Sequence, residues 1–157
     1  MIWFWLLVGA LLVCLACFLF FGRRVRSWGR LVLQERARES FALQRERLEA
    51  QFLNAAAATG KPRGLRWLDC AFERELELAR EIETGQIVGL VPVAIRFEAV
   101  EGGDMEGLPA VGNLRNASAV FVFERGRWWT AGKAVFNLNP AEVLQRFGQQ
   151  YEPLASA

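Results

Sequence analysis

The sequence predicts an α+β protein with an N-terminal transmembrane helix, a helical stalk, and then a small antiparallel sheet of about four strands with flanking helices. Three observations predict it. The first twenty-one residues contain no charged side chain. A stripe of apolar residues at helical spacing follows, and beyond it apolar and polar residues alternate with period two. We expect an anchor at residues 1–22, a basic helical juxtamembrane stalk at residues 23–60 and an α+β domain at residues 61–157.

The apolar N-terminal segment has the length of a membrane-spanning helix. Twenty residues run from Ile2 to Phe21, and thirteen of them are Leu, Ile, Val or Phe. They form about 30 Å of helix, which matches the hydrocarbon core of a bilayer. Their transfer favours insertion by about 5 kcal/mol. A cleavable signal peptide begins with basic residues and has a shorter apolar core, so we expect a retained anchor.

A cluster of basic residues follows the anchor: Arg23, Arg24, Arg26 and Arg30. Positively charged flanks stay in the cytoplasm, which predicts a single-pass protein of the cell membrane with its C-terminal domain in the cytoplasm. Residues 23–60 hold eight Arg against four Glu, whereas residues 61–157 hold eleven basic against thirteen acidic residues. Attraction to anionic lipid headgroups, about 1 kcal/mol per arginine, accounts for the basic stretch without nucleic acid. The expected partners are therefore the lipid bilayer and its headgroups.

A long helix is expected from about Ser27 to Ala58, because the segment is rich in helix-forming residues and has no proline. One face of this helix carries a stripe formed by Leu33, Ala37, Phe41, Gln44, Leu48, Phe52 and Ala55. Thr59-Gly60-Lys61-Pro62 predicts its end. The stripe has two interpretations, a coiled-coil dimer or packing of its second half on the domain that follows.

A first hairpin is predicted with Thr84-Gly85 as its loop. This register pairs Ile82 with Ile87, Leu78 with Val91, Leu76 with Val93, and Phe72 with Phe97. The opposite face has five glutamates, Glu73, Glu75, Glu77, Glu81 and Glu83, and it places Glu73 across from Arg96. These glutamates form a solvated face or attract a basic partner. Helix is the competing prediction for residues 72–83, but the cross-strand pattern favours a strand.

A second hairpin is predicted to turn at Arg125-Gly126, with Phe123 facing Trp128, Phe121 facing Thr130, and Val122 facing Trp129. A short helix should follow, because Asn139 is suited to the N-cap, Pro140 to N1 and Glu142 to N3. We expect one face of that helix to carry Val143, Leu144, Phe147 and Tyr151.

The adjacent tryptophans should lie on opposite faces of the sheet, since side chains alternate along a strand. The sequence places Trp128 in the core with Phe121, Phe123 and Phe136. The other face contains Val120, Val122, Trp129 and Val135. This second face is more apolar than a free surface requires, so either the C-terminal helix covers it or it is an interface with a protein partner or a second copy.

No catalytic, cofactor or metal site is predicted. The chain has no histidine, and Cys70 is the lone cysteine outside the anchor. A lone cysteine is most often a small, buried apolar residue. The acidic stretch from Glu98 to Glu106 does not have the alternating ligand spacing of a calcium loop. Glu98 and Asp104 are the candidates if the domain is a carboxylate-dependent enzyme.

Three stretches of the soluble part, GKPRGLRW, FEAVEGGDMEG and AVFNLNP, resemble those of uncharacterised bacterial single-pass membrane proteins. That resemblance implies no activity. The sequence as a whole predicts a membrane-tethered, non-enzymatic module that binds or organises another envelope component or itself. The alternatives are a small-ligand sensor whose curved sheet encloses a pocket and the carboxylate-dependent enzyme.

Overall fold

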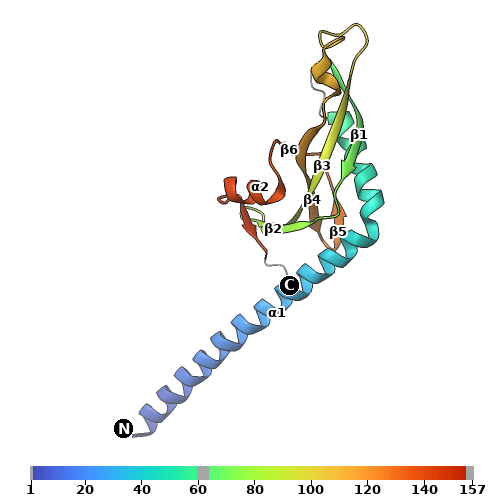
Figure 1. The fold of residues 1–157 in the computed structure, drawn as a ribbon. Coiled ribbons are helices and arrows are strands. Elements are labelled where there is room, and N and C mark those ends of the chain that lie inside the picture. The colour runs from blue at the N-terminus through green and yellow to red at the C-terminus, as the bar shows by residue number, and fades with distance from the viewer. Residues whose placement is uncertain (1, 60–63, 155–157) are drawn as a thin grey trace. The chain divides into compact units, whose positions relative to one another are not determined.

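The computed structural model describes the backbone of residues 2–59 and 64–154, and the side chains of residue 29, residues 31–58, 64–109 and 111–154. Two compact units are present, Met1–Arg36 and Ala37–Ala157. Helix α1 (Ile2–Thr59) spans the boundary between them and ends where the sequence predicts. The second unit is α+β, as predicted, and contains an antiparallel sheet with helix α2 (Pro140–Arg146) on one face (Figure 1).

The predicted anchor, residues 1–22, and the four arginines after it lie outside the described side chains. No helix in the described part of the chain combines the length and the apolar character that a membrane crossing requires.

The sheet has seven strands in place of the four expected. In chain order they are β1 (Leu65–Phe72), β2 (Glu77–Glu81), β3 (Ile87–Ala99), β4 (Arg115–Glu124), β5 (Arg127–Trp129), β6 (Ala134–Phe136) and β7 (Tyr151–Pro153), with the 3-10 turn η1 (Pro109–Gly112) before β4. β1 and β2 both pair with β3, one after the other, and β5 and β6 both pair with β4. The number differs because each outer arm of the two predicted hairpins is interrupted and because β7 is an additional strand.

The predicted register of the first hairpin is wrong by two residues between β2 and β3, and Phe72 lies opposite Val93 and not Phe97. Arg80 lies opposite Ile87 and Leu78 opposite Gly89, since the loop contains the four residues 82–85 and Gly85 closes it at φ +71°. A two-residue type I′ loop requires positive φ at both positions, and Thr84 does not adopt it. Ile82 is consequently 54% exposed and not in the core.

A further error concerns Glu73, which does not lie across from Arg96. Asp69 takes that place, because the four-residue loop and the interruption at residues 73–76 each shift the register by two residues. The strand prediction for this arm is confirmed, with β1 and β2 on either side of a short link at residues 73–76.

The second hairpin has the predicted register. Phe123 pairs with Trp128 and Val122 with Trp129, and the turn residues Arg125 and Gly126 both have positive φ. β5 ends at Trp129, so the predicted pairing of Phe121 with Thr130 does not continue the ladder; Thr130 instead donates its hydroxyl to the carbonyl of Val120 at 2.8 Å.

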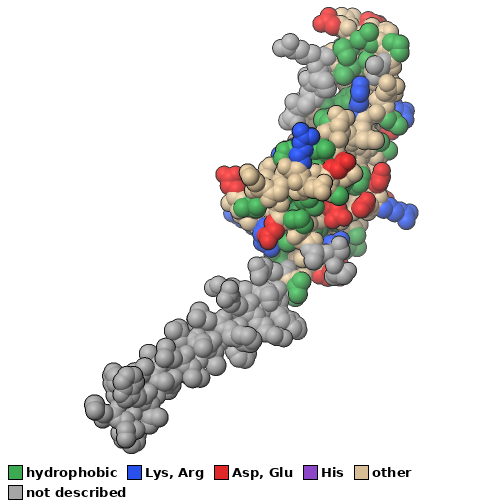
Figure 2. Space-filling view, turned by 60° about the vertical axis from the view of Figure 1, so that its left-hand side comes forward, with side chains coloured by type: hydrophobic (Ala, Val, Ile, Leu, Met, Phe, Trp, Pro, Cys, Tyr) green, Lys and Arg blue, Asp and Glu red, His purple; other side chains and the backbone are tan. Residues whose placement is uncertain are grey.

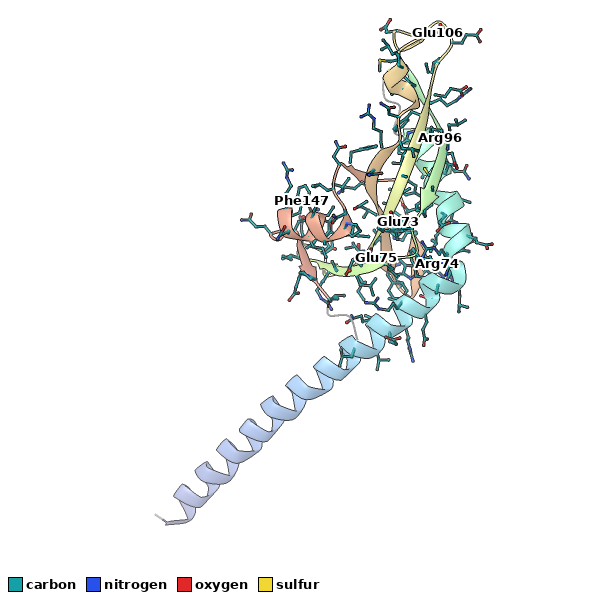
Figure 3. All side chains as sticks on the ribbon, in the orientation of Figure 1. Glu73, Arg74, Glu75, Arg96, Glu106 and Phe147 are labelled. Carbon is teal, nitrogen blue, oxygen red and sulfur yellow. The ribbon has the colours of Figure 1, made fainter. Side chains whose placement is uncertain are left out.

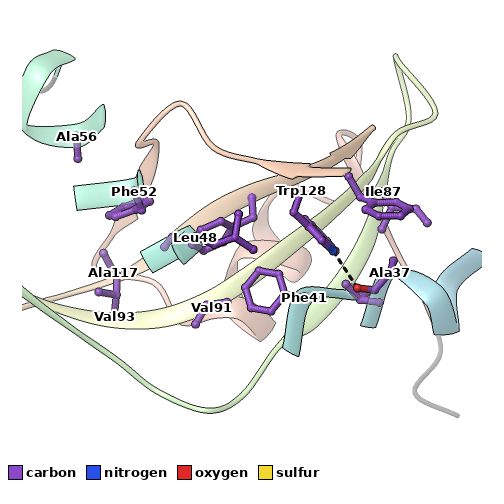
Figure 4. Packing of buried hydrophobic residues seen from close by; sticks show 14 of the residues in the cluster. Ala37, Phe41, Leu48, Phe52, Ala56, Ile87, Val91, Val93, Ala117 and Trp128 are labelled. Carbon is purple, nitrogen blue, oxygen red and sulfur yellow. Dashed lines mark hydrogen bonds between the residues drawn. The ribbon is translucent and has the colours of Figure 1, made fainter. Parts of the chain in front are cut away.

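The main core lies between the sheet and the second half of α1, the part from Ala37 onward (Figure 4). Phe41, Leu48 and Phe52 are buried there with Phe121 and Trp128, and the rings of Phe41 and Phe121 meet edge to face at 5.2 Å. Of the two interpretations of the stripe, the structure therefore shows packing on the domain. Ala56, and not Ala55, is the buried alanine near its end. Phe136, expected in this core, is exposed at the edge of the sheet.

A second, smaller core lies between the other face of the sheet and α2. It contains Ala79, Val88, Leu90, Val120, Val143, Leu144 and Tyr151. The sequence predicts a solvated face of glutamates on this side of the sheet. At β2, α2 covers that face. α2 begins at Pro140 as predicted but ends at Arg146, so Tyr151 does not extend its apolar face; it opens β7 and pairs with Glu81.

Candidate functional site

A cavity of about 600 Å³ lies on the α2 side of the sheet. Its floor is formed by β3 and β4 around Pro92 and Asn116. One wall is the link between β1 and β2, and the other is the segment that leads into α2. Figure 2 shows this side of the molecule, with several acidic side chains on it.

Pro92 explains why the sheet opens at this point. It lies in the middle of β3 and its carbonyl accepts a hydrogen bond from the Glu73 amide at 2.9 Å, but it has no N–H with which to return one. A proline in a central strand is accommodated by an irregularity in the neighbouring strand. β1 stops at Phe72, and the chain leaves the ladder until β2 begins at Glu77. The proline thus produces the link that forms the first wall.

Hydrogen bonds from α1 hold the backbone of the first wall. The guanidinium of Arg45 donates to the carbonyl oxygens of Glu73 and of Arg74, the latter at 2.9 Å. Its Nε bonds to the carboxylate of Glu49 at 2.7 Å. With its backbone held on the α1 side, the link presents the side chains of Glu73 and Glu75 to the cavity, and Figure 3 labels these residues.

The second wall is held by the capping box of α2. The side chain of Asn139 accepts from the Glu142 amide at 2.9 Å, and the carboxylate of Glu142 accepts from the Asn139 amide at 2.8 Å. Behind them, the buried hydroxyl of Ser118 donates to the carbonyl of Leu138 at 2.8 Å. These bonds connect the wall to β4, so both walls have fixed backbones.

A smaller hollow of about 430 Å³ adjoins the cavity and shares Asn139, Ala141 and Glu142 with it. Of the described residues that line the two, four are glutamates, namely Glu73, Glu75, Glu77 and Glu142, and Arg115 is basic. Within the described part of the chain, neither Glu73 nor Glu75 forms an ion pair. We call the cavity and the hollow together the acidic groove.

The residues that the sequence proposed as an interface are divided between core and surface. Val120 is 6% exposed and packs in the core under α2, with Val122 and Val135 half-buried at its margin. Trp129 is 43% exposed. None of the four lines the groove.

The acidic stretch from Glu98, near the end of β3, to Glu106, in the loop that follows, forms local contacts. Glu98 makes an ion pair with Arg66 at 2.6 Å, and the carboxylate of Glu106 accepts from the Gly102 amide at 2.8 Å. No group of three or more Cys, Asp or Glu side chains in the described ranges is placed to hold a metal ion. Cys70 is half-buried, and burial together with the charge of Asp69 raises the pKa of its thiol to about 11. The thiol is therefore protonated at neutral pH.

Comparison of the chain with protein-family models, with curated proteins and with solved structures finds no match.

The sequence indicated the glutamates of the groove and the N-cap role of Asn139, but it did not indicate that Asn116, Asn137 and Asn139 line a groove with them. Two sequence signals were available. One is a proline within an apolar strand pattern, and the other is the pair Asn137 and Asn139 before Pro140. Asn137 has φ +59°, a conformation that Asn tolerates better than most residues, and it turns the chain from β6 toward α2.

Proposed function

We propose that this protein is a membrane-tethered, non-enzymatic module that binds another protein of the cell envelope through the acidic groove. The twenty apolar residues from Ile2 to Phe21 support the tether. The observation on which the binding role rests is the groove itself, whose cavity of about 600 Å³ is lined by the carboxylates of Glu73 and Glu75, which form no ion pair with any described residue.

The lining of the groove favours a polypeptide over a small molecule. Small-molecule sites have similar volumes, but they enclose most of the ligand and are lined mainly by apolar side chains. Here most lining side chains are exposed, including Glu73, Glu75, Asn116, Asn139 and Glu142. An open, polar surface of this kind resembles the rim of a protein interface.

The lining also argues against a carboxylate-dependent enzyme. Such an enzyme pairs two carboxylates whose environments separate their pKa values, usually by burial of one of them. Glu73 and Glu75 are both solvent-exposed. Of the sequence candidates, Glu98 lies in β3 and Asp104 in the loop that follows it, and neither lines the groove.

Membrane attachment is tested by alkaline carbonate extraction of membranes that contain the full chain. The protein should stay in the pellet, because the apolar segment exchanges water for lipid; release into the supernatant rejects the tether. A phosphatase that is active only outside the cytoplasm, fused after Ala157, should be inactive if Arg23, Arg24 and Arg26 keep their flank inside. High phosphatase activity would show that the C-terminal domain lies outside the cytoplasm.

Binding at the groove is tested by photo-crosslinking in cells. A benzophenone amino acid at position 116 or 141, both exposed in the groove, should give one discrete crosslinked product. The same group at Glu46, on the exposed side of α1, is the control. If neither groove position gives a product, or if position 46 gives the same product, the groove is not the binding site.

A further inference from the structure

We infer that the segment which occupies the acidic groove is a stretch of another protein that carries lysine or arginine side chains. This inference rests on the proposed function and adds the chemistry of the partner.

Charge complementarity is the first argument. Glu73, Glu75, Glu77 and Glu142 line the groove against the single described basic lining residue, Arg115. Glu142 is engaged in the capping box of α2, whereas the carboxylates of Glu73 and Glu75 form no hydrogen bond or ion pair within the described ranges. Complementary charge across an interface raises the rate of encounter and selects among partners.

The way the two walls are held is the second argument. Arg45 forms an ion pair with Glu49. Its remaining described hydrogen bonds go to the backbone carbonyls of Glu73 and Arg74. It therefore positions the wall without pairing with the carboxylates of Glu73 or Glu75. A partner meets acidic groups whose backbone is already ordered, so it does not bear the conformational entropy of ordering that backbone.

The floor is the third argument. Pro92 lies on it with Asn116 and Ala117 of the neighbouring strand, and the ring of Pro92 is apolar. The adjoining hollow adds the aliphatic side chain of Leu144 and the ring of Pro153. The methylene groups of lysine or arginine can pack on such a floor while the charged ends stay in contact with water and with the carboxylates.

The experiment uses the full chain in non-ionic detergent and two labelled twelve-residue peptides, one of alternating Ala and Lys and one of alternating Ala and Glu. Fluorescence anisotropy at low salt should show binding of the lysine peptide and none of the glutamate peptide. Binding should weaken steadily as salt is raised, since exposed charge pairs are screened. The double variant Glu73→Gln/Glu75→Gln should weaken lysine-peptide binding by about fivefold.

The control is Glu39→Gln/Glu46→Gln, which removes the same charge from the exposed side of α1 and should change binding less than about twofold. The reversed variant Glu73→Lys/Glu75→Lys should bind the glutamate peptide in preference. Equal weakening by the two double Gln variants, or no binding of the lysine peptide by the parent chain, overturns the inference.

The two proposals fail separately. A crosslinked product from position 116 with no lysine-peptide binding rejects the basic partner and keeps the binding role. The absence of any product from positions 116 and 141 rejects the binding role itself. If the product is a dimer of this chain, the occupant is a second copy and the inference of another protein is wrong.

Discussion

The indole Nε1–H of Trp128 donates a hydrogen bond of 2.9 Å to the backbone carbonyl of Ala37, which lies 91 positions earlier in the chain. The hydroxyl of Ser40 is a second acceptor at 3.1 Å. The same indole meets the ring of Phe41 edge to face at 5.1 Å. Figure 4 marks the hydrogen bond to Ala37 with a dashed line. One side chain of β5 thus joins the sheet to α1, and from Ala37 onward α1 is part of the domain's core.

Trp128→Ala should destabilise the protein by about 3–5 kcal/mol, because burial and a hydrogen bond are lost and a cavity remains. Trp129→Ala should cost less than about 1 kcal/mol, since Trp129 is 43% exposed whereas Trp128 is 2% exposed. Denaturant unfolding of the full chain in detergent, followed by circular dichroism, measures both. Equal losses for the two variants contradict the assignment of Trp129 to the surface.

Gly132→Ala should destabilise the fold by more than about 2 kcal/mol. Gly132 has φ +72°, and a Cβ atom there would lie 2.2 Å from the backbone nitrogen of Ala56. Gly126→Ala is the matched control, because Gly126 has φ +80° with nothing within 4 Å of the added atom; it should cost only about 1 kcal/mol. If both variants melt at the same temperature, the close approach of residue 132 to α1 is not a constraint.

Arg45→Gln should loosen the first wall of the groove, because the carbonyls of Glu73 and Arg74 lose their charged donor. We expect a loss of about 1.5 kcal/mol and faster amide hydrogen exchange at residues 73–77. Arg47→Gln is the control, since Arg47 is exposed and, among the described residues, bonds only to Gln44 of the same helix. Unchanged exchange at residues 73–77 in the Arg45 variant refutes the positioning role.

Asn139→Ala should cost about 1 kcal/mol, because the Glu142 amide loses the cap that now accepts its hydrogen bond. Gln145→Ala, on the exposed side of the same helix, should change stability by less than about 0.5 kcal/mol. Thermal melts of both variants give the comparison, and a larger loss for Gln145→Ala disagrees with the capping box.

Cys70 should react with iodoacetamide slowly at neutral pH, and the rate should continue to rise up to about pH 11, because burial and then the charge of Asp69 raise the pKa of its thiol to about 11. The full chain with Cys14→Ala and Cys17→Ala isolates this thiol. An ordinary cysteine ionises near pH 8.5. The unfolded chain therefore loses this proton first, and the contribution of Cys70 to stability falls as pH rises from about 8.5 toward 11. A rate plateau near pH 9 contradicts the raised pKa.

Local sequence rules were sufficient for the second hairpin and for the start of α2. Arg125-Gly126 sets a two-residue turn, which fixes Val122 opposite Trp129. Asn139, Pro140 and Glu142 set the first turn of α2 through a capping box. Each of these features depends on residues within a few positions of one another, so their chemistry can be recognised without knowledge of the rest of the fold.

The first hairpin shows where local rules stop. Thr84-Gly85 has the composition of a two-residue loop, but a four-residue loop moves the register by two residues. The link at residues 73–76 depends on Pro92 from one partner strand and on Arg45 from α1. β7 depends on its pairing with β2 and not on the composition of its three residues.

The sequence by itself determined the α+β class, the alternation that separates Trp128 from Trp129, and the apolar length from Ile2 to Phe21 that predicts a membrane anchor. Only the tertiary structure decided that α2 covers Val120 while the floor at Pro92 stays open, and that the carboxylates of Glu73 and Glu75 line a groove. The physical reason is the separation along the chain between the residues that must interact. Periodicity and caps act over one or two turns of chain, whereas the groove requires α1, the sheet and the segment before α2 to meet from positions up to about a hundred residues apart.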